Sequence, residues 1–189
     1  DVVAYLPYNR EVTDFKSVPF DLAAQNDILY GVAKVIKDVP TASLMMQHAM
    51  TLVRVRLMKN EYMGTGLVSD MTFAGVFISG TVNALTGTVT KDYNHGRGSV
   101  KVGGNYMLND ESPVIVDAIM IPRSSYEEQA ASVSFVIDGQ KHTYTFPIQH
   151  EWKAGMKYTY TLKMTGNYNA PVNKEQVDID VEYWGQYGK

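Results

Sequence analysis

Residues 132–148 read SVSFVIDGQKHTYTFPI, and this stretch determines the fold class. Apolar and polar side chains alternate on both sides of Asp138-Gly139, which is the side-chain period of a β-strand with one buried face. An Asp-Gly pair between two alternating runs is a strong hairpin signal, because both residues tolerate positive φ. The stretch therefore predicts an antiparallel hairpin with strands on either side of Asp138-Gly139-Gln140.

The same period continues in both directions along the chain. Residues 156–165 alternate Met, Tyr and Leu with Lys and Thr, and residues 177–184 alternate apolar side chains with Asp and Glu. Residues 53–57 alternate with Arg on the outer face. Residues 114–121 form an apolar run with Asp117 inside it, which suits a strand buried on both faces or a central strand of a sandwich. Helix signals are sparse, with short candidates at 21–25 and 125–131. Many short strands separated by turn signals predict an all-β sandwich or barrel.

The first 40 residues have a different character. A short strand ends in the phrase Ala4-Tyr-Leu-Pro-Tyr8, a polar stretch follows, and residues 28–31 are apolar again. We interpret residues 1–40 as a remnant of, or connector from, an N-terminal domain. Residues 41–189 are then a C-terminal β-sandwich domain.

Composition restricts the partners and the chemistry. The chain has 189 residues, 45% of them apolar, a formal net charge of −3 and no cysteine. The 17 basic residues are scattered, so no nucleic-acid surface is expected. No apolar run has the roughly 18 residues that a spanning helix needs. The chain begins with Asp1 rather than Met, so we expect a processed product or a fragment.

No motif for catalysis or metal binding is visible. The four histidines, His48, His95, His142 and His150, show no recognisable spacing with a Ser or Asp, and there is no Gly-x-Ser-x-Gly elbow. His48 and His142 are better interpreted as core or rim residues. The 20 acidic residues leave a carboxylate pair across a cleft open, although no motif supports one. We predict a protein that is not an enzyme and has no catalytic residue, metal or cofactor.

Aromatic side chains offer a binding hypothesis. Trp152, Trp184 and Tyr187 are candidate ligand-contact residues, because exposed aromatic rings on a sandwich can stack on sugar rings. The loop Asp92–Gly98 is a further candidate. The competing and favoured interpretation is that the aromatic rings fill the ends of a two-sheet core.

Several phrases occur in order along nearly the whole chain. They are AYLPY at 4–8, DILYG at 27–31, HAMTLVRVRL at 48–57 and WKAGMKYTYTL at 152–162, followed by the closing strand to Trp184. In this order and spacing the chain resembles the fimbrillin-like (Mfa-like) family of Bacteroidales surface proteins. The last phrase, an Ala-Gly-x-x-Tyr-x-Tyr-x-Leu strand after a variable hairpin, is the most specific.

The resemblance implies a fold, a location and partners. Family members have two transthyretin-like, Greek-key antiparallel β-sandwich domains in tandem, of which this chain is similar to the second. They are exported as lipoproteins, so the expected location is the outer membrane and cell surface. Many are subunits of type V pili, and the expected partners are other fimbrial subunits joined by β-strand exchange. Most of the N-terminal domain and the lipid-bearing Cys have no counterpart in this sequence.

Two functions therefore remain as hypotheses. The first is a structural subunit or adhesin of a fimbrium that assembles by strand addition. Its candidate donor strand carries Val177, Ile179, Val181 and Tyr183, although the same pattern suits a strand that closes its own sandwich, which is the favoured interpretation. The second is a module that binds a carbohydrate or another host ligand.

Overall fold

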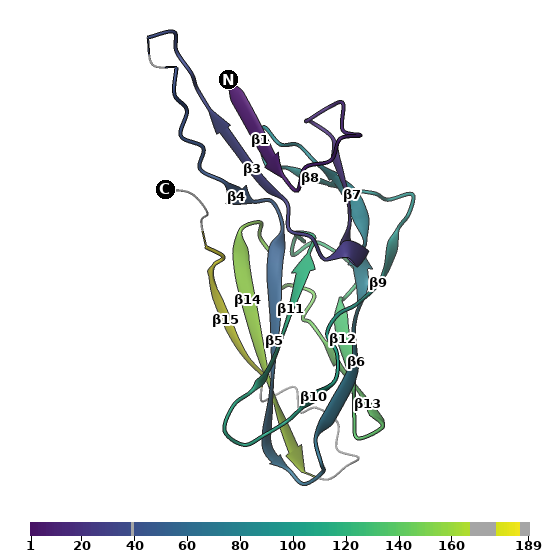
Figure 1. Ribbon diagram of the computed structural model, residues 1–189. Helices are drawn as coiled ribbons and strands as arrows, with labels where there is room; N and C mark the ends of the chain where they lie inside the picture. The colour runs from purple at the N-terminus through teal and green to yellow at the C-terminus, as the bar shows by residue number, and fades with distance from the viewer. Residues whose placement is uncertain (39, 167–176, 186–189) are drawn as a thin grey trace.

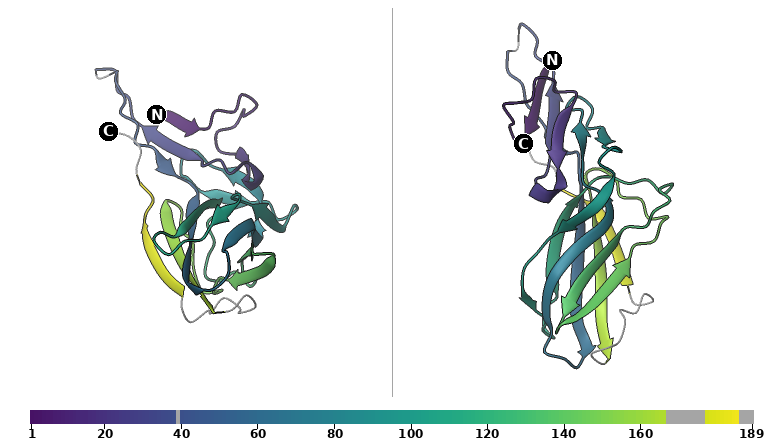
Figure 2. Two further views of the ribbon diagram at one scale, coloured as in Figure 1. Left: turned by 60° about the horizontal axis from the view of Figure 1, so that its bottom comes forward. Right: turned by 90° about the vertical axis from the view of Figure 1, so that its right-hand side faces the viewer.

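The protein is an all-β sandwich, seen in a computed structural model that describes residues 1–38, 40–166 and 177–185 (Figure 1). Two larger sheets face each other, and two three-stranded sheets lie at one end of them (Figure 2). The period-two pattern had predicted an all-β sandwich or barrel, and the family resemblance had implied the sandwich that the structure shows. In the part of the chain that the structure describes, no helix has the length and apolar character needed to cross a membrane.

The first large sheet has the strand order β11-β5-β14-β15. Its strands β5 and β14 run parallel, whereas β11 pairs with β5 and β15 pairs with β14 in antiparallel fashion. The two outermost strands of this sheet are therefore β11 and β15. The bounds are β5 (Thr51–Tyr62), β11 (Val114–Met120), β14 (Met156–Gly166) and β15 (Val177–Tyr183).

The second large sheet has the order β10-β6-β12-β13, and β9 also pairs with β6. Its pairs are antiparallel, and the predicted hairpin is the pair β12–β13. A bulge interrupts the pairing of β12 with β6 between Ser134 and Val136. The bounds are β6 (Leu67–Phe77), β9 (Arg97–Lys101), β10 (Tyr106–Met107), β12 (Ser132–Ile137) and β13 (Gln140–Thr145).

Strands from the first 40 residues pair with later strands. The two small sheets have the orders β1-β3-β4 and β2-β7-β8. A single 3-10 turn, η1 (Leu22–Ala24), is capped by Asp21, whose carboxylate accepts the backbone N–H of Ala23. The domain boundary near residue 40 stays a prediction. In the structure, β2 pairs with β7 and β3 pairs with β4, so both pairings join residues on the two sides of that boundary. The bounds are β1 (Val2–Leu6), β2 (Val18–Asp21), β3 (Leu29–Ala33), β4 (Gln47–His48), β7 (Ser79–Val82) and β8 (Val89–Lys91).

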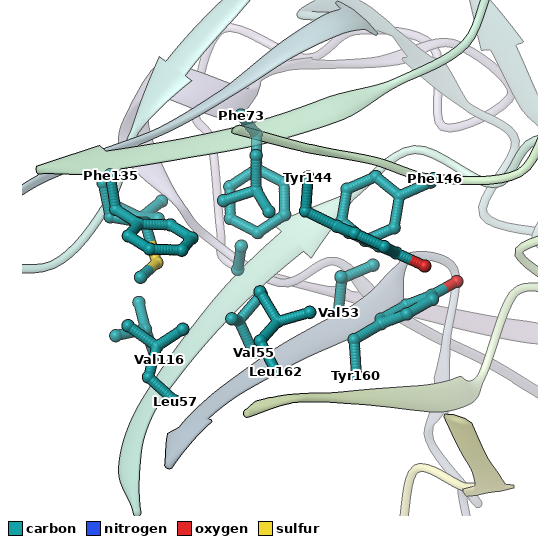
Figure 3. Close-up of a cluster of buried hydrophobic side chains, with 14 of the residues drawn as sticks. Val53, Val55, Leu57, Phe73, Val116, Phe135, Tyr144, Phe146, Tyr160 and Leu162 are labelled. Carbon is teal, nitrogen blue, oxygen red and sulfur yellow. The ribbon is translucent and has the colours of Figure 1, made fainter. Parts of the chain in front are cut away.

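The main core lies between the two large sheets. Alternate side chains of β5, β11 and β14 meet those of β6, β12 and β13, and Figure 3 shows how they interdigitate. Tyr160 of β14 lies at the centre, with its ring centroid 4.6 Å from that of Phe146. Its hydroxyl accepts the indole N–H of Trp152 at 2.9 Å. Burial raises the pKa of Tyr160 to about 12, so the hydroxyl stays protonated at physiological pH.

Strand β11 differs from its sequence-based prediction. The continuous apolar run had indicated a strand buried on both faces, but the strand is an edge of its sheet and Ile115 is 47% exposed. On the outer face of β11, an ion pair with β5 takes the place of apolar packing. Asp117 lies directly opposite Arg54 of β5 and accepts two hydrogen bonds from it, each 2.7 Å long. An apolar run alone does not distinguish a central strand from an edge strand.

The turn of the β12–β13 hairpin is joined to the β5–β6 connection by one carboxylate. Asp138 has a positive φ of 48° and accepts the N–H groups of Gly66 and Leu67 and the hydroxyl of Tyr62. Partial burial raises the pKa of Asp138, but these hydrogen bonds together outweigh it and hold the pKa below 3.8. The carboxylate therefore stabilises the folded state in its charged form.

We predict that Asp138→Ala lowers the free energy of unfolding by about 2 kcal/mol at pH 7, because three donors lose a charged acceptor. Asp110→Ala is the control, since its side chain is 70% exposed and makes one long contact with Lys59. Urea unfolding followed by tryptophan fluorescence measures both variants. Equal stability of Asp138→Ala and the wild type at pH 7 would contradict the proposed role.

The lowered pKa of Asp138 makes its contribution to stability depend on pH. A carboxyl whose pKa is lower in the folded state stabilises the protein above its unfolded pKa, and this stabilisation is lost as the pH falls through the folded value. The stability difference between wild type and Asp138→Ala should therefore narrow below about pH 3.8.

Candidate functional site

The carboxyl-terminal strand β15 is the predicted donor strand, and the structure places it at the edge of its own sheet. Leu162 of β14 lies opposite Val177, and Met156 lies opposite Tyr183, so the antiparallel pairing runs the full length of β15. In this state β15 completes its own sandwich, as the favoured interpretation had it. Pairing of β15 with a second chain stays a prediction.

The outer face of β15 is acidic and lies beside basic side chains of β14. Lys157 pairs with Glu182 directly opposite, and Lys163 pairs with Asp178 at 3.0 Å. The two carboxylates are 53% and 72% exposed, so each ion pair contributes at most about 1 kcal/mol. These ion pairs favour the observed register between β14 and β15, but they add little to the stability of the pairing.

The inner face of β15 is apolar but poorly covered. Ile179 is 39% exposed, Val181 46% and Tyr183 83%. Their partners on β14 differ in burial: Tyr160 and Tyr158, opposite Ile179 and Val181, lie in the main core, whereas Met156, opposite Tyr183, is half-buried. At the start of β15, Val177 packs against the main core, whereas the side chains from 178 to 183 are exposed.

The residue after β15, Trp184, has a defined binding place. Its backbone N–H donates to the carbonyl of Gly155 at 2.8 Å, and its ring stacks on His48 with a centroid distance of 3.9 Å and an angle of 11°. Nδ1 of His48 lies 2.5 Å from a carboxylate oxygen of Asp27. We call His48, Asp27 and Gly155 the Trp184 seat. A pocket of about 200 Å³ adjoins it, lined in part by Tyr30.

The other two candidate aromatic residues give no exposed ring in the described structure. Trp152 is 1% exposed, and its ring packs against Phe146 with Arg123 5.4 Å from the ring centroid. Its ring faces are therefore covered by protein, and it fills the core as the favoured interpretation had it. Tyr187 lies outside the described residues. A host glycan or protein ligand stays a prediction.

The loop Asp92–Gly98, the other binding candidate, is fixed by hydrogen bonds near both of its ends. The carboxylate of Asp92 accepts the N–H groups of Asn94 and His95. At its far end, Arg97 donates to the carbonyl of Gly75 at 2.8 Å and lies over the ring of Phe77. Tyr93 of this loop is 75% exposed.

One carboxylate joins this loop to the segment before β12. Nζ of Lys91 and a guanidinium nitrogen of Arg97 both donate to Glu127, whose side chain is 11% exposed. Burial raises the pKa of Glu127, but the two cations outweigh it and hold the pKa below 4.5. Sequence reasoning missed this cluster, because its members come from distant segments.

We predict that Glu127→Gln lowers the free energy of unfolding by about 2 kcal/mol, since Lys91 and Arg97 lose their common counter-charge. The amides of residues 94–96 should also exchange faster with deuterium. Glu128→Gln, at the exposed neighbouring position, is the matched control and should change neither quantity. If both variants behave alike in urea unfolding and hydrogen exchange, the cluster has no special role.

His142 lies in the core, as its interpretation from the sequence had it. His142 is 7% exposed and stacks near Phe135, and burial lowers its pKa. Within residues 1–38, 40–166 and 177–185, no group of three or more His, Asp or Glu side chains is placed to hold a metal ion. Among the described residues, the β15 edge and the Trp184 seat are therefore the candidate functional site.

The fold is an all-β sandwich with β15 at the edge of one sheet, and the sequence identifies the family. The profile of the fimbrillin-like family matches residues 1–184, so the chain belongs to this family. No curated protein sequence matches the chain.

Two crystal structures share the fold. A candidate cell adhesion protein from Bacteroides uniformis has a TM-score of 0.71 and 19% identity, with 97% of this chain and 72% of that chain covered. A candidate cell adhesion protein from Bacteroides ovatus has a TM-score of 0.70 and 15% identity, with 96% and 66% covered. At these identities the likeness establishes the fold.

Proposed function

We propose that this chain is a structural subunit or adhesin of a bacterial cell-surface fimbrium, and that it assembles by strand addition with β15 as the donor. Membership of the fimbrillin-like family supports a fimbrial or adhesive role rather than catalysis. Similar folds in two Bacteroides proteins described as candidates for cell adhesion agree with it. The proposed location is the cell surface, with a lipoprotein precursor at the outer membrane.

The observation that carries the proposal is the contrast between β15 and β14. The inner face of β14 is buried by the opposite sheet, whereas the apolar side chains of β15 at 179 and 181 are 39% and 46% exposed. Apart from Val177, whose side chain packs against the main core, β15 contributes little to that core. A strand that leaves its sheet at low cost, yet has apolar side chains on one face and a full set of backbone donors and acceptors, suits addition to another chain.

We predict that locking β15 onto β14 blocks assembly. Thr159 and Asp180 lie directly opposite each other, and the chain has no cysteine, so Thr159→Cys with Asp180→Cys forms a single disulfide inside one chain. The oxidised double variant should remain monomeric at concentrations at which the wild type forms fibres. Light scattering after size exclusion and electron microscopy measure the difference.

A disulfide elsewhere is the matched control. Ser134→Cys with Thr143→Cys bridges β12 and β13 at directly opposite positions and leaves β15 untouched. This variant should assemble like the wild type, and reduction should restore assembly of the locked variant. Fibres formed equally well by the oxidised locked variant would exclude β15 as the donor. A wild-type chain that stays monomeric at every concentration tested would exclude assembly by strand addition.

A further inference from the structure

A further pocket lies where the two small sheets meet. It is formed by the loop after β1, strand β2 and the turn η1, and its volume is about 180 Å³. Such a volume holds roughly ten water molecules, which is the size of one sugar ring with its hydroxyl groups. None of the described residues that line it belongs to β15 or to the Trp184 seat. The pocket is therefore a separate feature that the proposed function does not use.

Hydrogen bonds between side chains and backbone fix the walls of this pocket. Gln25, at the end of η1, donates to the carbonyl of Ile119 at 3.2 Å and accepts the N–H of the same residue at 2.9 Å. The turn η1 is thereby joined to β11. In the loop after β1, the carbonyl of Asn9 accepts the hydroxyl of Tyr5 at 3.1 Å. Because the fold holds both segments in place, the pocket needs little rearrangement to accept a ligand.

The polar side chains of the pocket keep hydrogen-bonding groups for a ligand. Oδ1 of Asn9 accepts the N–H of Glu11 at 2.9 Å, and Oδ1 of Asp21 accepts that of Ala23 at 2.8 Å. The amide nitrogen of Asn9, Oδ2 of Asp21 and the side chain of Asn26 make no hydrogen bond with any group that the structure describes. The pocket thus offers two amides that donate and a carboxylate oxygen that accepts.

Apolar surface lies beside these polar groups. Pro7, Pro19 and Phe20 line the same pocket. The half-buried ring of Phe20 lies against Gly80 of β7, where a Cβ would come within 2.9 Å of the ring, so the ring keeps its place only because residue 80 has no side chain. A sugar presents the matching combination, since its ring has apolar C–H faces and a rim of hydroxyls.

The charges in the pocket restrict the class of ligand. No Lys, Arg or His is among the described lining residues, so a phosphate or a carboxylate ligand would lack a counter-charge. Of these lining residues Asp21 alone carries a carboxylate, whereas a calcium ion takes about six to eight oxygen ligands. A neutral ligand rich in hydroxyl groups is the class that remains.

A second, shallower depression continues from the pocket across the sheet β2-β7-β8. The two share Pro19 and Phe20 as lining residues. Pro19 lies opposite Thr81, and Thr81 lies opposite Thr90, so the three side chains are on one face of this sheet. The hydroxyls of Thr81 and Thr90 add hydrogen-bonding groups along the depression. A chain of sugars that ends in the pocket can therefore extend over Pro19.

We infer that this pocket binds the terminal neutral sugar of a glycan, with Asp21 accepting a hydroxyl hydrogen and Asn9 and Asn26 donating to hydroxyl oxygens. The next sugar of the chain lies over Pro19, toward Thr81. The inference goes beyond the proposed function, because binding takes place on a single chain and requires neither fibres nor β15.

Saturation-transfer NMR on the folded chain tests the pocket. Glucose, galactose, mannose, fucose, N-acetylglucosamine and glucosamine are each added at millimolar concentration. We expect a signal from at least one neutral sugar, and Ala24→Trp, which fills the pocket, should abolish it. Absence of a signal from every neutral sugar would overturn the inference. Binding of glucosamine alone would also contradict it, because the carboxylate of Asp21 would then be recognising a cation.

Asn26→Ala locates the binding in the pocket. The Asn26 side chain is exposed and makes no hydrogen bond to a described residue, so its loss should leave the fold intact and weaken sugar binding about tenfold. Asn105→Ala, at an exposed asparagine just before β10, is the matched control and should bind like the wild type. Circular dichroism establishes that both variants are folded. Equal affinities of the two variants would place the sugar elsewhere and overturn the inference.

The path of the glycan beyond the pocket has its own test. Thr81→Ala should weaken a disaccharide that ends in the bound sugar several-fold and leave the single sugar unchanged. If the variant binds the disaccharide as well as the wild type does, the glycan leaves the pocket in another direction and the path over Pro19 is wrong.

Discussion

The structure depends on the burial of the inner face of β14. Tyr160 packs against Phe146 and accepts a hydrogen bond from Trp152, and the parallel pairing of β14 with β5 connects this cluster to the rest of the first sheet. These side chains are buried between the two large sheets, and β15 adds Val177 at the edge of this core. Most side chains of the last strand therefore lie outside the core and are accessible for recognition.

This arrangement separates two kinds of contact along β15. Backbone pairing and surface ion pairs define where the strand lies, but exposed ion pairs contribute little to stability. The ring of Trp184 supplies a contact with a buried partner, His48, at the end of the strand. Because its backbone pairing runs the full length of the strand and few of its side chains are buried, β15 is suited to open as one unit.

The sequence was sufficient for the features that depend on local pattern. The hairpin around Asp138-Gly139, the strand over 156–165 and the capped turn after Asp21 follow from side-chain period and turn chemistry. The position of a strand within its sheet does not, and so the apolar run of β11 was assigned to a buried strand although it is an edge. The parallel pairing of β5 with β14 joins segments about 100 residues apart, for which no local pattern exists.

The candidate site shows the same division. Period-two alternation was enough to identify β15 as a strand with an apolar face, but the exposure of that face depends on where the opposite sheet ends. Trp152 and Trp184 looked equivalent in the sequence, yet one is in the core and the other lies on a histidine contributed by a distant segment. The pairing of His48 with Asp27, 21 residues apart, has no motif that would have revealed it.

Native-state hydrogen exchange of the intact chain tests the central claim most directly, namely that β15 opens while the core beneath β14 stays closed. The account predicts that amides of residues 177–183 exchange through a local opening with a much lower free energy than amides of β5, which should exchange only on global unfolding. Equal opening free energies for β15 and β5 would contradict it, because β15 would then be an inseparable part of the core.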